Sequence, residues 1–323
     1  MKIVMLDRMG TDFTLEKKAF RDAGATFLVT YFRDADDLRS IVRDADVLMF
    51  NDANISADVI SALEKCKMII RYGIGYDNVD LEAAGKKGIY VCNAPSYGTY
   101  DVAEHTMALL LSVCKHIPLA DKCARTGQWN ADRVGKVRRL CGKTLGLVGF
   151  GRIAQKVAAR ARAFEMDLLV YDPYVNADAA TALGAQCVDF PTLLEQSDYV
   201  TLHSPLNEET HHMMGMPQFK LMKKDAVLIN TGRGGLVNEK ELTFALLSGE
   251  IAGAALDVFE EEPLPPTSKL RDMENVVLTP HVAWNSFEGT DDLHAEVTDN
   301  VLRVLRGEAP INVVNHKFLG SKF

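Results

Sequence analysis

The stretch Thr144-Leu-Gly-Leu-Val-Gly-Phe-Gly-Arg-Ile-Ala-Gln155 decides the fold of this chain. Its apolar part, Leu145–Val148, is typical of a buried parallel strand. The turn that follows, Gly149-Phe-Gly151-Arg-Ile-Ala154, has the form GxGxxA and leads into a helical pattern. In such a unit the first glycine allows a tight turn, the second lets the backbone approach a pyrophosphate, and the small third residue lets helix and strand pack closely. The sequence therefore predicts a dinucleotide-binding βα unit.

The residues after this turn favour one dinucleotide over another. The next predicted strand, Leu168-Leu-Val-Tyr-Asp172, ends in an acid 23 residues after Gly149 (172 − 149). A carboxylate at this place binds the adenosine ribose hydroxyls and would repel a 2′-phosphate, so we expect NAD rather than NADP. The alternative is that Asp172 only ends a strand before Pro173. The cofactor-binding candidates of this unit are Gly149, Gly151, Arg152, Ile153 and Asp172, because the helix N-terminus offers its N–H groups to the phosphates.

Composition limits the possible functions. A chain of 323 residues suggests about two domains. A net charge of −8 argues against nucleic acid as the main partner, since phosphate binding needs clustered Lys and Arg. Six cysteines are scattered without metal-ligand spacing, so we expect no metal site and a reducing, cytoplasmic compartment. The longest apolar run, around Met107 to Cys114, is too short to span a bilayer, and no signal peptide is evident at the N-terminus, so no membrane partner is expected.

The chain shows the strand–helix alternation of α/β proteins twice. In the first hundred residues we expect strands at Ile3–Leu6, Thr26–Thr30, Val47–Phe50, Met68–Ile70 and Ile89–Cys92, and helices at Leu15–Ala23, Asp36–Arg43, Ala57–Lys65 and Leu81–Lys86. After the glycine turn, further strands are expected at Asp167–Tyr171, Gln186–Val188, Tyr199–Leu202, Ala226–Asn230, Ala252–Leu256 and Val276–Leu278.

Two long helices flank the second series of strands. Asp101-Val-Ala-Glu104 has the spacing of a capping box, which predicts a helix that opens there and runs to about Lys115. A last amphipathic helix is expected from Phe287 to Arg306. If this helix returns to the first unit, the nucleotide-binding unit is an insertion into another domain, which explains why its glycine turn comes so late.

Arg233, Glu262 and His281 each follow a predicted strand. In open α/β sheets, ligands bind at the carboxyl ends of the strands, so these three side chains suggest one convergent site. Taken singly, Arg233 could be a surface charge in a loop, Glu262 part of a solvated acidic run, and His281 a capped turn residue.

Several motifs occur in order along essentially the whole chain. They are Asn93-Ala-Pro-Ser, Val102-Ala-Glu-His-Thr, Gly142-Lys-Thr-Leu-Gly, Asn230-Thr-Gly-Arg-Gly-Gly and Thr279-Pro-His. At these residues the sequence resembles the D-isomer-specific 2-hydroxyacid dehydrogenase family. The run Ile70-Arg-Tyr-Gly-Ile-Gly-Tyr-Asp-Asn-Val-Asp80 and His281-Val-Ala-Trp284 look most like the branch that contains the C-terminal-binding-protein co-repressors and their bacterial relatives.

The resemblance implies a fold and an activity. The expected fold class is α/β, with two Rossmann-like doubly wound parallel-sheet domains. An NAD-binding domain (residues 99–285) is inserted into a flavodoxin-like substrate domain (residues 1–98 and 286–323), the active site lies between them, and the long helix near Asp101 mediates a homodimer. The activity is NAD-dependent hydride transfer that interconverts a D-2-hydroxy acid and its 2-keto acid. His281 would be the acid/base, and Glu262 would favour the charged form of the His281 ring. Arg233 would bind the substrate's carboxylate and keto oxygen.

Further site residues are expected around these three. Substrate-binding candidates are Arg71, Tyr72, Gly73, Ile74, Gly75 and Trp284, the glycine loop offering backbone N–H groups to the carboxylate. By resemblance, His203, Ser204, Pro205, Thr210, Thr231, Gly232, Arg233, Asp257, His281 and Ala283 contact the cofactor. Arg71 could instead be a surface charge at a strand end, and Trp284 a core residue.

Two points stay open at this stage. The substrate could be glyoxylate, hydroxypyruvate or a keto acid with a modest side chain. The alternative function is an NAD(H)-sensing scaffold of the co-repressor type with little turnover, because such proteins keep the same three residues. The chain ends at Phe323, soon after the last helix, so we expect neither a long co-repressor tail nor a C-terminal regulatory domain.

Overall fold

The computed structural model describes residues 1–7 and 10–320, and the chain divides into two compact units. The terminal unit consists of Met1–Gly98 and Ser286–Phe323, and the central unit of Thr99–Asn285. Because the chain leaves the terminal unit once and returns to it once, the central unit is an insertion. Both units are α/β, and all strand pairings within their two sheets are parallel.

The terminal unit is built on a five-stranded sheet of order β2-β1-β3-β4-β5. Its strands are β1 (Lys2–Leu6), β2 (Thr26–Thr30), β3 (Val47–Phe50), β4 (Met68–Arg71) and β5 (Tyr90–Cys92). Its helices are α1 (Thr14–Asp22), α2 (Ala35–Val42), α3 (Ala57–Ala62), α4 (Leu81–Lys86) and α13 (Phe287–Leu305), with a 3₁₀ turn η3 (His316–Phe318). This strand order is that of flavodoxin-like folds. The four residues of β3 are all buried, as expected for a strand covered on both faces.

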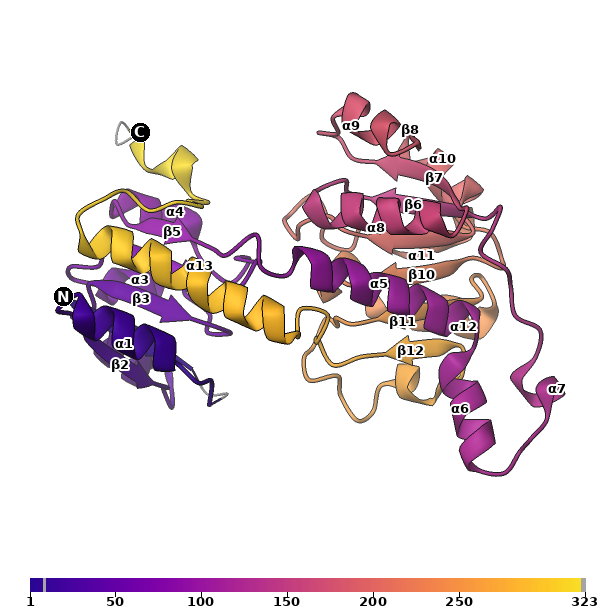
Figure 1. Cartoon of the computed structure of the whole chain (residues 1–323), viewed down its shortest axis with the longest axis horizontal. Helices are drawn as coiled ribbons and strands as arrows, with labels where there is room; N and C mark the ends of the chain where they lie inside the picture. The colour runs from indigo at the N-terminus through magenta and orange to yellow at the C-terminus, as the bar shows by residue number, and fades with distance from the viewer. Residues whose placement is uncertain (8–9, 321–323) are drawn as a thin grey trace. The chain divides into compact units, whose positions relative to one another are not determined.

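The end of the chain belongs to this same unit. Figure 1 shows α13, drawn in yellow, lying beside the indigo α1, although their sequences are nearly 300 residues apart. Ser286 caps α13 by accepting a hydrogen bond from the Gly289 N–H at 2.7 Å. Further on, the Asn315 side chain makes two hydrogen bonds of 2.9 Å at the start of β5. Its amide oxygen accepts from Val91 N–H, and its amide nitrogen donates to Ile89 C=O, just before the strand.

The central unit is built on a seven-stranded sheet of order β12-β11-β10-β9-β6-β7-β8. Its strands are β6 (Thr144–Val148), β7 (Asp167–Tyr171), β8 (Ala185–Cys187), β9 (Tyr199–Leu202), β10 (Val227–Asn230), β11 (Gly253–Leu256) and β12 (Val276–Leu278). The strand order reverses between β6 and β9. The carboxyl ends of these two strands therefore form the switch point at which doubly wound sheets bind ligands.

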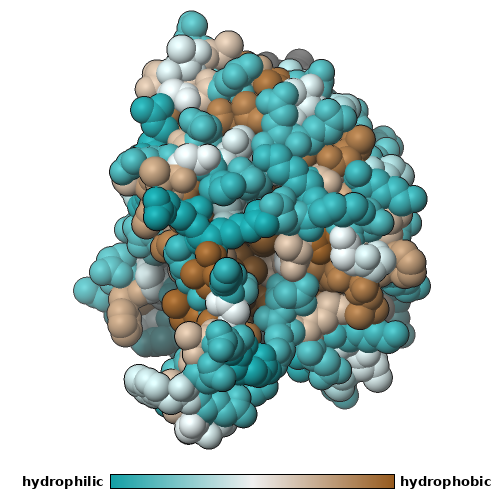
Figure 2. Space-filling view, turned by 90° about the vertical axis from the view of Figure 1, so that its right-hand side faces the viewer, coloured by the Kyte–Doolittle hydropathy of each residue, from teal (hydrophilic) through white to brown (hydrophobic). Residues whose placement is uncertain are grey.

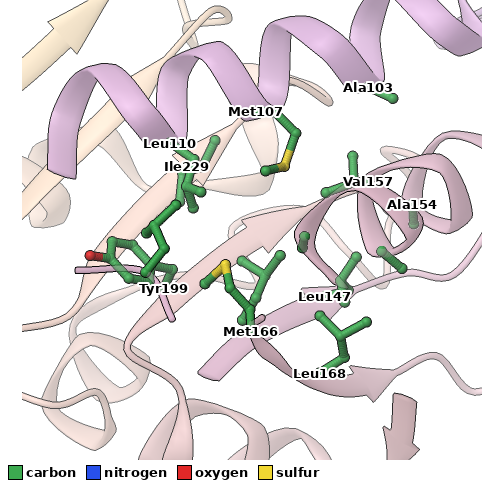
Figure 3. Close-up of a cluster of buried hydrophobic side chains, with 14 of the residues drawn as sticks. Ala103, Met107, Leu110, Leu147, Ala154, Val157, Met166, Leu168, Tyr199 and Ile229 are labelled. Carbon is green, nitrogen blue, oxygen red and sulfur yellow. The ribbon is translucent and has the colours of Figure 1, made fainter. Parts of the chain in front are cut away.

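Helices cover both faces of this sheet. They are α5 (Thr99–Cys114), α6 (Ile117–Arg125), α7 (Ala131–Val134), α8 (Arg152–Ala163), α9 (Ala177–Ala182), α10 (Phe190–Gln196), α11 (Met216–Leu221) and α12 (Glu239–Ser248), with 3₁₀ turns η1 (Gly234–Leu236) and η2 (Lys269–Asp272). Figure 3 shows the core beneath α5 and α8, where Met107 and Leu110 lie above Leu147 and Leu168. Ala103 and Ala154 are small, and this allows the two helices to pack closely.

Several expected boundaries differ from the structure: the helix expected over 57–65 ends at Ala62, and the first long helix begins earlier than expected. The first long helix begins at Thr99, so Asp101 lies within its first turn and is not the capping residue. An acid is favoured throughout the first turn by the helix dipole, not only at the cap. The same pattern therefore fits two neighbouring start positions, and sequence alone does not separate them.

The surface of the central unit is mostly hydrophilic on the face shown in Figure 2, with separate hydrophobic patches. Figure 1 places α6, α7 and α12 on this side of the unit. Exposed apolar side chains on these elements and the loop between the first two include Ile117, Trp129, Phe244 and Leu247. Among the described residues, no helix is long and apolar enough to cross a membrane.

The core in Figure 3 yields a stability prediction. Leu147 is fully buried in β6, so Leu147→Ala should leave a cavity and destabilise the central unit by about 2–5 kcal/mol. The matched control, Leu247→Ala, removes the same atoms from a side chain that is 62% exposed on α12, and should change stability by no more than about 0.5 kcal/mol. Urea denaturation followed by circular dichroism measures both. Equal effects of the two substitutions would contradict this assignment of the core.

Candidate active site

The glycine turn between β6 and α8 is held against a neighbouring strand end. Gly149 has a φ of +87° and its N–H donates to Tyr171 C=O at 2.8 Å. A Cβ at Gly149 would lie 2.8 Å from the carbonyl carbon of His203, so only glycine fits without a backbone shift. At Gly151, the N-cap of α8, no atom lies within 4 Å of the place a Cβ would take. This turn therefore leaves open space directly at a helix N-terminus, as a bound pyrophosphate requires.

Asp172 lies beside the same turn. Its Oδ2 accepts a hydrogen bond from Phe150 N–H and its Oδ1 one from Tyr174 N–H, both at 2.8 Å. These two N–H groups fix the carboxylate after the last residue of β7. A carboxylate has further lone pairs for the two hydroxyls of a ribose. The residues present therefore fit NAD.

Arg233 follows β10 in a loop held by Asn230. The Asn230 side-chain amide donates to Arg233 C=O at 2.9 Å, and its oxygen accepts from Gly232 N–H at 3.0 Å. A Cβ on Gly234 would lie only 1.9 Å from the carbonyl carbon and oxygen of Phe259. The glycine thus lets the Arg233 loop lie directly against the backbone that leads to Glu262.

His281 and Glu262 form a hydrogen-bonded pair. His281 Nδ1 lies 2.6 Å from Glu262 Oε2, and Glu262 Oε1 accepts from Phe259 N–H at 2.9 Å. Burial acts to raise the pKa of Glu262, but the hydrogen bond and charge of His281, the Phe259 N–H and the charge of Arg233 outweigh it. The pKa of Glu262 is therefore below its usual value, and the group stays a carboxylate at neutral pH.

Asp257, at the end of β11, shapes the loop that carries His281. Its buried carboxylate accepts hydrogen bonds from Val282 N–H at 3.0 Å, Ala283 N–H at 2.9 Å and the Thr279 hydroxyl at 2.6 Å. His281 itself has a φ of +54°, which is unusual for a residue other than glycine. The backbone therefore turns sharply at His281 around a fixed carboxylate.

Sequence reasoning missed the contribution of α5. His105 Nε2 lies 3.0 Å from Thr279 Oγ1, and Thr106 Oγ1 lies 2.8 Å from Thr231 Oγ1. Two adjacent residues of one helix thus contact the loops that carry His281 and Arg233. The motif Val102-Ala-Glu-His-Thr was noted for its resemblance, but nothing in it shows which strand ends the helix touches.

A second histidine, His203, lies near the glycine turn. Burial lowers the pKa of His203 to about 4, so its ring is neutral at neutral pH. Its ring Nε2 lies 3.0 Å from Thr201 Oγ1. His281, by contrast, has a carboxylate at hydrogen-bond distance, that of Glu262.

The remaining predicted residues fall into two groups. In the central unit, Thr210 Oγ1 donates to Pro205 C=O at 2.7 Å, and Trp284 Nε1 donates to His281 C=O at 3.1 Å. Arg152 and Ile153 are the first two residues of α8, Ser204 follows β9, and Gly232 and Ala283 lie in the loops that carry Arg233 and His281. Arg71, Tyr72, Gly73, Ile74 and Gly75 belong to the terminal unit, at the end of β4 and in the loop after it. The Tyr72 side chain is buried there, with its hydroxyl 2.6 Å from Glu16 Oε1, so its ring is not offered to a ligand.

Comparison with known proteins now adds to this geometry. The model of the family "D-isomer specific 2-hydroxyacid dehydrogenase, NAD binding domain" matches residues 107–283. A glyoxylate reductase of Korarchaeum cryptofilum is 43% identical over 281 residues, which cover 85% of this chain and 84% of that protein. The chain belongs to the D-isomer-specific 2-hydroxyacid dehydrogenase family.

Two further similar proteins differ in how much of their length the match covers. A D-3-phosphoglycerate dehydrogenase of Methanocaldococcus jannaschii is 44% identical over 282 residues; the match covers 87% of this chain but only 53% of that protein, so this chain spans about half its length. The crystal structure of a D-lactate dehydrogenase from Aquifex aeolicus, complexed with NAD and lactic acid, has a TM-score of 0.87 at 28% identity, covering 95% of this chain and 96% of that one.

Membership settles several expectations. The fold class, the NAD cofactor and the assignment to NAD-dependent 2-hydroxyacid oxidoreductases are confirmed, and the scaffold alternative is not favoured. The resemblance to the co-repressor branch and the homodimer stay predictions. Within the part of the chain that the structure describes, no group of three or more His, Cys, Asp or Glu residues could hold a metal ion.

The glycine turn gives a binding prediction. Gly149→Ala should raise the Kd for NADH at least about tenfold, because the new Cβ meets the His203 backbone in the turn that is predicted to bind the phosphates. Gly142→Ala is the matched control, since Gly142 also has a positive φ, +72°, but nothing within 4 Å of its Cβ position. Titration of NADH fluorescence measures both. A Kd that Gly142→Ala raises as much as Gly149→Ala would exclude the turn as the phosphate site.

Proposed function

We propose that this chain reduces a short 2-keto acid to its D-2-hydroxy acid with NADH, and catalyses the reverse reaction, with His281 as the acid/base. The observation that carries the proposal is the 2.6 Å pair of His281 and Glu262 in the unit that also carries the glycine turn. The Arg233 loop, packed on the Phe259 backbone next to this pair, adds a cation near it.

The proposed chemistry follows from charge. When bound, NADH supplies the hydride to C2 of the keto acid. Negative charge then develops on the carbonyl oxygen, and an imidazolium at His281 can donate its proton there. Arg233, which is always charged, offers a planar fork that suits both the carboxylate and the keto oxygen.

Glu262 determines which nitrogen of His281 reacts. Because Nδ1 faces the Glu262 carboxylate, the proton on Nδ1 stays in that hydrogen bond, and Nε2 exchanges its proton with the substrate. The lowered pKa of Glu262 keeps this partner negative, which stabilises the imidazolium. His203 is unsuited to this role because burial keeps its ring neutral.

The substrate is proposed to be small, with glyoxylate first and hydroxypyruvate second. The glyoxylate reductase is matched over 84% of its length at 43% identity, whereas the D-lactate dehydrogenase is only 28% identical and the phosphoglycerate dehydrogenase has nearly half its length outside the match. We propose that the loop Arg71–Gly75 binds the carboxylate through backbone N–H groups. Trp284, whose indole donates to His281 C=O, is proposed to pack against the substrate side chain.

A substrate panel tests this function. Glyoxylate, hydroxypyruvate, pyruvate and phenylpyruvate should each be tried with NADH and NADPH, and we expect oxidation of NADH with at least one. Arg233→Ala should lower kcat for that acid by about 10²–10³. The control Arg125→Ala removes an exposed arginine on α6 that pairs with Asp121, and should leave turnover unchanged. Tight NADH binding without turnover on any acid would reject the proposal, and near-normal turnover of Arg233→Ala would reject the role of that residue.

The pair predicts a pH effect. In Glu262→Gln the amide still accepts a hydrogen bond but no longer stabilises positive charge on His281. The pH above which the rate of keto-acid reduction falls by half should therefore move down by about one unit or more. Initial rates between pH 5 and 9 measure this midpoint, with Glu261→Gln as the control, because Glu261 is the neighbouring exposed acid. An unmoved midpoint in Glu262→Gln would show that this carboxylate does not act on the catalytic proton.

A further inference from the structure

Three polar side chains meet in the core of the terminal unit, from parts of the chain that are far apart. Tyr72 Oη lies 2.6 Å from Glu16 Oε1 and 2.5 Å from His294 Nδ1, and His294 Nδ1 lies 2.6 Å from Glu16 Oε1. Glu16 lies on α1, His294 on α13, and Tyr72 directly follows β4. We call these three residues the buried triad.

The triad is enclosed. Glu16 is 0%, Tyr72 5% and His294 9% exposed, and the Phe13 ring packs edge-on against both Tyr72 and His294. In the described chain, Glu16 Oε2 is buried and meets no hydrogen-bond donor. A buried carboxylate is costly unless a cation or strong donors compensate it, so the triad depends on all three of its members.

The charges around the triad favour a protonated His294. The hydrogen bond and charge of Glu16 raise the pKa of His294 against the opposing effect of burial, and Asp291 and Asp12 add to the rise. Near Tyr72, burial and Glu16 raise the pKa of the phenol, with Asp7 acting in the same direction, so the phenol keeps its proton. Both Tyr72 and His294 can therefore donate to the Glu16 carboxylate.

The triad acts on the loop that starts at Tyr72. The carbonyl groups of this loop are bound: Tyr72 C=O accepts from Arg71 Nη1 at 3.0 Å, Gly73 C=O from Ala94 N–H at 3.0 Å, and Ile74 C=O from Asn93 Nδ2 at 2.7 Å. The N–H groups of residues 73–75, by contrast, donate to no acceptor within the described chain. The loop is thus held by its carbonyls and by the Tyr72 side chain, and of the three donors without an acceptor, those of Ile74 and Gly75 belong to residues that are partly exposed.

We propose that Glu16 and His294 are positioning residues for the substrate carboxylate: by binding the Tyr72 hydroxyl they fix the backbone of residues 73–75 so that its N–H groups stay available to the 2-keto acid. This inference rests on the proposed function. It assigns to the first and last helices of the terminal unit an effect on substrate affinity, although neither residue touches substrate.

A purely structural triad would affect stability without affecting one ligand selectively. A positioning role instead predicts different effects on the binding of two ligands, the keto acid and NADH. The KM for the keto acid should rise, whereas the Kd for NADH should stay unchanged, because the glycine turn lies in the central unit. Tyr72→Phe removes the hydroxyl, and Glu16→Gln removes the negative charge to which that hydroxyl donates, so both substitutions weaken the same contact. Their effects on KM should not add in the double variant.

The experiment uses the full chain, with glyoxylate as substrate and oxamate, an unreactive analogue of a 2-keto acid, as competitive inhibitor. Tyr72→Phe should raise both the KM for glyoxylate and the inhibition constant of oxamate about tenfold, the scale of one hydrogen bond to a charged group. Its kcat should stay within about threefold. Tyr76→Phe is the matched control, because it removes an exposed hydroxyl from the same loop and should change neither constant.

The outcomes separate this inference from the function on which it rests. An active wild type whose constants are unmoved by Tyr72→Phe, or additive effects of Tyr72→Phe and Glu16→Gln, would overturn the positioning role and leave the proposed function intact. A wild type inactive on every 2-keto acid would overturn both. If Glu16→Gln does not fold, Tyr72→Phe decides alone, since it removes a single hydroxyl and keeps the ring packed on Phe13.

Discussion

The central unit depends on how it compensates one buried charge, the Asp257 carboxylate at the end of β11. A buried carboxylate is stable only when donors surround it. Here the donors are the Thr279 hydroxyl and the N–H groups of residues 282 and 283, so the segment after β12 must curl around Asp257. The sharp turn at His281, with its positive φ, is a consequence of that curl. The carboxylate that fixes this loop is thus not the one that binds the His281 ring, and the two acids have separate partners.

Most of the fold could be predicted because parallel strands are buried on both faces. Such strands are short, continuous apolar runs, and Val47–Phe50, Tyr199–Leu202 and Val276–Leu278 have the same bounds in the structure as in the sequence. The glycine turn could be predicted equally well, because its spacing is imposed by the close approach of the Gly149 backbone to His203. Arg233, Glu262 and His281 were found because they follow predicted strands, whose carboxyl ends meet at one edge of a parallel sheet.

What could not be predicted depends on contacts between distant segments. No local pattern indicates that His105 lies next to Thr279, or that Glu16 and His294 meet at Tyr72, 56 and 222 residues away from it. Which residue a helical side chain contacts depends on the complete fold, so the local sequence does not indicate it. Tyr72 illustrates the difference. The sequence made it a substrate-binding candidate without showing how its ring points, and its neighbours in space bury that ring and leave only the backbone of the loop for binding.

Two of the glutamate–histidine pairs in the described part of the chain share a separation of 2.6 Å but differ in burial. In the pair of Glu262 and His281 the side chains are 35% and 38% exposed, so the imidazole can reach a bound molecule and exchange its proton. In the pair of Glu16 and His294 they are 0% and 11% exposed, and the third partner is a phenol that keeps its own proton. A proton there has no route to substrate, so the pair can act only by holding atoms in place. The same chemical groups are therefore suited to proton exchange in one unit and to holding a side chain in place in the other, and accessibility rather than distance makes the difference.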